Sequence, residues 1–113
     1  MLVKLEKVSG ILFINSTITV QLEGGPEILA ECQVIVCKNK NDEWTFSDVE
    51  PIDIDSIKMM GVEITELKAK QAAIEHFKNM GINLWEVISK EMLALLDEYT
   101  PQEFVREMMG IEL

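Results

Sequence analysis

The residues best suited to metal or nucleophilic chemistry are one histidine and two cysteines. His76 is the only histidine, which excludes a two-histidine metal site. Cys32 and Cys37 are five positions apart in a run that alternates like a strand, so their side chains should point to opposite faces. We therefore expect two reduced cysteines that cannot bond each other, and no zinc site.

The remaining candidates for catalysis lack the patterns that catalysis requires. His76 falls at the border of the apolar side of a predicted helix, and no neighbour in the sequence is placed to orient it as a general base. Gly24-Gly25-Pro26 lacks the lysine and the following helix of a phosphate loop and is typical of a turn. The serines and threonines lack the glycine pattern of a nucleophile elbow. The sequence thus predicts no catalytic residue, no cofactor and no enzyme.

Acidic side chains cluster between residues 42 and 55, where no lysine or arginine intervenes. Such a cluster could hold a hard cation, but the calcium-loop spacing, with its central glycine and terminal glutamate, is absent. Acids that alternate with isoleucine are typical of the solvated face of a half-buried strand. We expect solvated carboxylates here, and four of them are candidates for a protein contact: Asp48, Glu50, Asp53 and Asp55.

The charge balance limits the possible partners. Among 113 residues, 20 are acidic and 10 are basic, which gives a net charge of −10. That charge opposes direct binding to nucleic acid or to an anionic membrane, and one arginine, Arg106, cannot form a paired phosphate clamp. The apolar stretch at residues 11–14 is far shorter than a membrane span, and residues 3–6 alternate where a signal peptide would be apolar. We expect a cytoplasmic protein.

The first half of the chain has the periodicity of strands. Turn signals at Ser9-Gly10, at residues 23–26 and at residues 39–42 separate predicted strands at residues 2–8, 11–22 and 28–38 and a further one from Trp44. Pro51 should end that strand, and residues 52–57 then form either a fifth, edge strand or an extended connector.

The second half has the periodicity of helices. Thr65 is expected to cap a first helix that stops at Gly81 and whose apolar side includes Leu67 and Met80. Asn83 should cap a second helix, and Pro101 should open a short third one that runs to residue 109. The core-facing arc of the second helix is predicted to contain Leu84, Trp85, Ile88, Met92, Leu95, Leu96 and Tyr99.

Strands followed by helices, without strict alternation, indicate an α+β fold. We expect one domain over residues 1–113, strand-rich over about 2–57 and helical over about 65–110. The strands should form an antiparallel meander of four to five members, with two to three helices packed on one sheet face.

The pattern points to binding rather than catalysis. Leu93 lies outside the apolar arc of the second helix and could mark a partner contact. The leading hypothesis is a non-catalytic binding or accessory protein of a bacterium or its phage, acting through protein–protein contacts and associating with itself through edge strands and surplus apolar helix surface. One alternative is an acidic inhibitor that mimics nucleic acid in the basic groove of a host nuclease or defence complex. Another is a small-ligand binder or enzyme with a pocket between sheet and helices.

Overall fold

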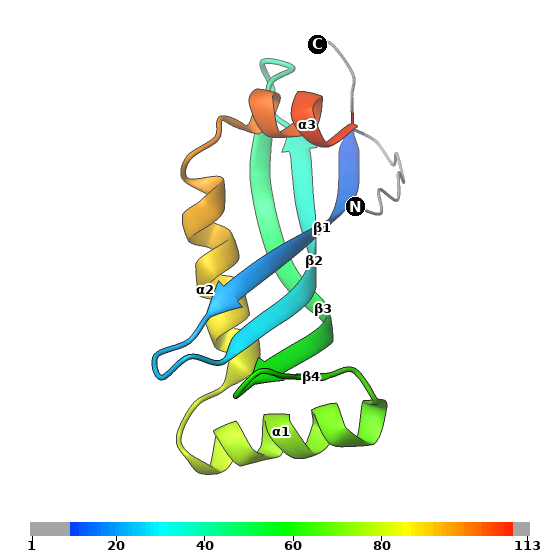
Figure 1. Ribbon diagram of the computed structural model, residues 1–113. Coiled ribbons are helices and arrows are strands. Elements are labelled where there is room, and N and C mark those ends of the chain that lie inside the picture. Colours follow the sequence, from blue (N-terminus) through cyan, green and yellow to red (C-terminus); the bar gives the residue numbers. More distant parts are fainter. Residues whose placement is uncertain (1–9, 110–113) are drawn as a thin grey trace.

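The structure, a computed structural model, describes residues 10–109, so the strand predicted at residues 2–8 lies outside them. Four strands precede three helices and pair in chain order as one antiparallel sheet (Figure 1). The elements are β1 (Ile11–Gln21), β2 (Glu27–Lys38), β3 (Trp44–Met59), β4 (Val62–Ile64), α1 (Leu67–Asn79), α2 (Leu84–Leu96) and α3 (Pro101–Met109). The predicted α+β fold is confirmed, with strands continuing to residue 64 rather than 57.

The alternation of apolar and polar residues decides which face of the sheet is buried. On β2 the even-numbered residues from 28 to 36 are fully buried, whereas Glu31 and Gln33 between them keep part of their surface in solvent. We call the face that carries these even-numbered residues the inner face and the opposite one the outer face. The helices pack on the inner face, where their apolar side chains join those of the strands in one core.

The prediction that Pro51 ends a strand is wrong, because β3 runs through it without interruption. The separate strand predicted at residues 52–57 is the second half of β3. β4 pairs only with Ile57, Lys58 and Met59, so at Pro51 the strand has a neighbour on one side alone. A proline fits there because its missing N–H is not needed for a second ladder.

Three register shifts distinguish β3 from its neighbours. In its pairing with β2, the residues Ser47, Ile52 and Asp55 have no opposite residue and are passed over. Each extra residue is a β-bulge, which bends its strand and increases the local twist. The sheet accordingly curls into a half-barrel (Figure 1).

The turns form as the sequence indicated. Between β2 and β3, the side-chain oxygen of Asn39 accepts hydrogen bonds from the backbone N–H groups of Asn41 and Glu43, at 2.9 and 3.0 Å. Asp42 takes a left-handed backbone conformation with φ +61° and forms an ion pair with Lys38 at 3.2 Å. The Asn39 side chain therefore binds backbone N–H groups in the turn, where the chain reverses between β2 and β3.

Two of the three helices begin where the sequence predicts, and α1 does not. Glu66, not Thr65, is the N-cap of α1, and its side chain makes no capping hydrogen bond. Asn83 caps α2 as predicted, accepting from the N–H groups of Trp85 and Glu86 at 3.1 and 3.4 Å.

The start of α3 is fixed in a similar way. The Thr100 hydroxyl accepts from the N–H of Glu103 at 3.2 Å, and the rings of Tyr99 and Phe104 meet edge to face with their centroids 6.2 Å apart. This contact is a hydrophobic staple, which fixes the angle at which the chain enters α3. Phe104 is 1% exposed and continues the core under the far end of the sheet.

The core-facing side of α2 is narrower than predicted. Its fully buried residues recur every four positions: Leu84, Ile88, Met92 and Leu96. Leu95 and Tyr99 are half-buried, and Trp85 is 37% exposed at the margin of the buried face. On α1 only two residues of the predicted apolar side are buried, Ala73 and Phe77.

Leu67 and Met80 are 64% and 61% exposed, contrary to prediction. Leu67 is the first residue of α1 and Met80 is its C-cap, so both lie outside the stretch that contains the buried residues Ala73 and Phe77.

Candidate functional site

The outer face of the sheet has no helix over it in the part of the chain that the structure describes. Its side chains form rows across the strands, because the antiparallel register places residues of β1, β2 and β3 directly opposite one another. Three neighbouring rows are Phe13–Ile35–Asp48, Asn15–Gln33–Glu50 and Thr17–Glu31–Asp53. This face is the first candidate for a binding surface.

Three exposed carboxylates follow one another along β3 on the outer face. Asp48 and Glu50 are two positions apart and share a face by the ordinary alternation of a strand. Glu50 and Asp53 are three positions apart and would lie on opposite faces of a regular strand. The bulge at Ile52 adds one residue between them, so both lie on the outer face. Their opposite residues on β2 are two positions apart, so the three carboxylates follow one another at intervals of roughly 7 Å along the sheet. We call Asp48, Glu50 and Asp53 the acidic row.

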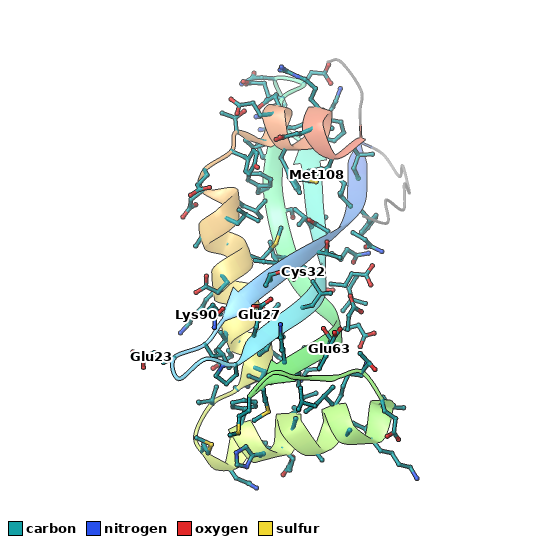
Figure 2. All side chains as sticks on the ribbon, in the orientation of Figure 1. Glu23, Glu27, Cys32, Glu63, Lys90 and Met108 are labelled. Carbon is teal, nitrogen blue, oxygen red and sulfur yellow. The ribbon has the colours of Figure 1, made fainter. Side chains whose placement is uncertain are left out.

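Further carboxylates on the same face add to the negative charge. Glu31 on β2 lies opposite Asp53 in the acidic row. The register places Lys58 between Glu27 on β2 and Glu63 on β4. Figure 2 labels these two glutamates, toward the end of the sheet near α1. Lys58 is the only basic residue that the register of the described strands places on the outer face, so the face is strongly negative.

The two other predicted contact residues do not belong to the acidic row. Asp55 is the bulged residue of the third register shift and is half-buried. Leu93 is 52% exposed on α2, in the helical layer behind the sheet. Of the five predicted contact residues, the structure therefore brings three together and leaves two apart.

Side chains block the edge of β3 that β4 leaves open. The carboxylates of Asp48 and Asp53 accept from the N–H groups of Val49 and Ile54, each at 2.9 Å. The Lys70 ammonium of α1 donates to the carbonyl of Ile54 at 2.9 Å. Pro51, between these positions, has no N–H to offer. Strand addition at this edge is therefore opposed residue by residue.

The second candidate surface lies where α2 meets the edge of β3. Trp85, Ser89 and Leu93 follow each other at intervals of four residues along α2, so they lie on one side of the helix. Pro51, Trp85 and Ser89 line a surface hollow of about 310 Å³ together with Glu86 and Lys90. Ile52, 46% exposed, adjoins Pro51. We call Pro51, Ile52, Trp85, Ser89 and Leu93 the Trp85 surface.

Trp85 also borders a second hollow, of about 320 Å³, on the side of α1. This hollow is lined by Ile74, Lys78 and Asn83 among others. The indole therefore forms a ridge between two depressions. A large aromatic ring in such a position is typical of residues that anchor protein contacts.

The two thiols and His76, the side chains best suited to chemical reaction, belong neither to the acidic row nor to the Trp85 surface. Cys32 is buried on the inner face and Cys37 is half-buried on the outer face, as the alternation predicted, and both are free thiols. Burial, aided by the charge of Glu31, raises the pKa of the Cys32 thiol to about 11. His76 is exposed, and its ring packs edge to face on Phe77 at 5.8 Å.

Two further observations concern polar groups within residues 10–109. No three side chains of histidine, cysteine, aspartate or glutamate gather closely enough there to hold a metal ion. The Asn15 side chain on the outer face is buried, and its oxygen has no hydrogen-bond partner among the described residues. Asn15 lies opposite Gln33, beside the acidic row.

Sequence reasoning missed two features of these surfaces. The acidic row depends on the bulge at Ile52, and the only signal for it was Pro51 inside an otherwise regular strand pattern. The Trp85 surface was missed because tryptophan at the margin of an apolar arc was assigned to the core.

No helix among the described residues is both long and apolar enough to cross a membrane. Comparisons with models of protein families, with curated proteins and with solved structures found no match for this chain. The two surfaces themselves are therefore the evidence for function.

Proposed function

We propose that this chain is a non-catalytic binding protein whose outer sheet face binds a positively charged surface of another protein. The observation that carries the proposal is the acidic row, three exposed carboxylates that a bulge aligns on a sheet face that no helix within residues 10–109 covers. Opposite charges steer association and set specificity, and a uniform row selects for a partner with a matching row of lysines or arginines.

The hydrogen bonds within the acidic row also favour a positively charged partner. Asp48 and Asp53 each use one carboxylate oxygen on a backbone N–H, which fixes the orientation of the side chain. A carboxylate held in this way loses less conformational entropy on binding than a free one. Arginine, with its planar set of donors, is the side chain best suited to fixed carboxylates.

A narrower form of the proposal concerns the partner's own ligand. A row of negative charges at regular intervals, two of them held by backbone N–H groups, resembles a nucleic-acid backbone more than scattered surface acids do. The chain would then act as an inhibitor, of bacterial or phage origin, that occupies the basic groove of a nuclease or defence complex. It would act in the cytoplasm, where the two thiols stay reduced.

The test uses two variants with equal changes in net charge. The first neutralises the acidic row by Asp48→Asn, Glu50→Gln and Asp53→Asn, and keeps the amide oxygens that can still accept from Val49 and Ile54. The control neutralises three carboxylates at the end of α2 by Glu91→Gln, Asp97→Asn and Glu98→Gln, all exposed. Wild-type protein captures partners from bacterial lysate, and association rates with the purified partner are then measured against salt concentration.

We expect the acidic-row variant to associate more slowly and with a weaker dependence on salt, whereas the control variant should behave like the wild type. If both variants bind the captured partner equally well at every salt concentration, the proposal is wrong. The narrower form requires in addition that DNA or RNA compete with the chain for the partner. A partner that binds no nucleic acid would remove that form alone.

A further inference from the structure

One flank of α2, beside its core-facing side, carries two exposed apolar side chains with a small residue between them. Trp85 is 37% exposed and Leu93 is 52% exposed, and the small, half-buried Ser89 lies midway between them. All three follow the four-residue spacing of one helix side. This stripe runs along the margin of the buried face, next to the edge of β3 that carries Pro51 and Ile52.

The stripe is complementary to itself when it is reversed. If a second α2 lies antiparallel across it, with the two-fold axis at Ser89, then Trp85 of each copy faces Leu93 of the other. Glu86 of each copy comes within reach of Lys90 of the other on the same flank of the helix. The small side chain at the axis lets the two helices approach closely.

We infer that a second copy of this chain docks on the Trp85 surface, with the two α2 helices antiparallel about a two-fold axis near Ser89. Leu93 of the second copy then covers the hollow of about 310 Å³ beside Trp85 and Pro51. This inference goes beyond the proposed function and does not rest on it, because it uses none of the residues of the acidic row.

The distribution of charge favours this surface for a copy of the same chain. Two copies each carry a net charge of −10 and repel each other, most strongly where the acidic outer faces approach. Around the Trp85 surface the charge is balanced, with Glu86 and Lys90 on one hollow and Glu75 and Lys78 on the other. In Figure 2, Lys90 lies well apart from Glu63 of the outer face.

The blocked edge of β3 argues against the simplest rival arrangement. A dimer that continues the sheet through β3 would have to displace the hydrogen bonds that Asp48, Asp53 and Lys70 make with that edge. Contact through the side chains of α2 requires no such displacement. The helices rather than this strand edge are therefore the surface for a second copy.

The first experiment measures the mass of the full chain by sedimentation and light scattering from micromolar to submillimolar concentration. We expect a species of twice 12.8 kDa that dissociates on dilution. Trp85→Ala should raise the dimer dissociation constant at least about 30-fold, as an anchor residue would. Leu93→Gln, at an exposed position that tolerates a polar side chain, tests the same contact without risk to the fold. Leu67→Ala removes an exposed leucine elsewhere and should change nothing.

The second experiment tests the register of the two helices. Glu86→Lys and Lys90→Glu should each weaken the dimer, and the double variant should restore it. If net charge alone mattered, Glu86→Lys would strengthen the dimer because it reduces repulsion, so the sign for this variant is decisive. Ser89→Cys, in a Cys37→Ser background, should give a disulfide-linked dimer on oxidation, whereas Ser47→Cys on β3 should not.

A monomer of 12.8 kDa over the whole concentration range would overturn the inference. So would a dimer whose affinity is unchanged by both Trp85→Ala and Leu93→Gln, since the contact would then lie on another surface.

Discussion

Truncation of Ile88 at the centre of α2 tests how the helix is attached to the sheet. Ile88 is fully buried in the core that the inner-face strands share with α2. Ile88→Ala removes three carbons, worth about 2.4 kcal/mol at about 0.8 kcal/mol for each buried carbon. The cavity left behind adds about 1 kcal/mol, so we expect a loss of about 3 kcal/mol in the free energy of unfolding.

The assay is urea unfolding followed by far-UV circular dichroism. With a slope of about 1–3 kcal/mol per molar urea for a domain of this size, the midpoint should fall by about 1–3 M. Leu67→Ala is the matched control, because it removes the same number of carbons at the start of α1, where the side chain is 64% exposed. Its effect should stay within about 0.5 kcal/mol. If Ile88→Ala left the midpoint unchanged, or cost no more than the control, α2 would not bury the side of the helix described above.

Three further predictions concern the thiol, a cap and a turn. The pKa of the Cys32 thiol is about 11 in the folded state and 9.0 in the unfolded state. The free energy of unfolding should therefore fall as the pH rises from about 9 to about 11, and Cys32 should contribute no pH dependence below or above that range. Cys32→Ala should remove this part of the pH dependence of urea unfolding, and Cys37→Ala should leave it in place. Asn83→Ala removes the acceptor for two N–H groups of α2 and should lower the free energy of unfolding by about 1 kcal/mol. Asn79→Ala, at the last residue of α1, is the comparison variant. Gly81 has a φ of +84° with open space where a Cβ would lie, so Gly81→Ala should cost about 1–2 kcal/mol through the backbone alone, measured by thermal unfolding. A cost well above that range would mean that the added methyl group meets a neighbour.

The sequence predicts this fold well where one local signal decides the structure. The period-two alternation located β1 and β2 to within a residue at each end, because each strand buries one face and exposes the other. Asn83 was found as a cap because its side chain alone can satisfy the N–H groups of the first turn. Gly81 ended α1 because its left-handed backbone favours glycine.

The predictions are wrong where the conformation or burial of a residue depends on a neighbour that is distant in the sequence. Pro51 breaks a strand only if a ladder needs its N–H, and whether β4 reaches that far cannot be read from local sequence. Trp85 and Leu67 fit an apolar arc equally well, but burial depends on where the sheet ends beneath each helix. The alternation of aspartate with isoleucine around residue 53 predicted a packed Ile52, which is instead 46% exposed because it is the bulged residue.

The bulge at Ile52 connects the two surfaces on which the functional argument rests. Because Ile52 is passed over in the register, Asp53 returns to the outer face and completes the acidic row. The same displacement leaves Ile52 exposed next to Pro51, at the edge where Trp85 and Ser89 form the apolar hollow. A regular strand would have separated Glu50 from Asp53 and turned Ile52 to a sheet face. One extra residue thus gives β3 both the charged side that we propose binds a basic partner and the apolar edge that we propose binds a second copy of the chain.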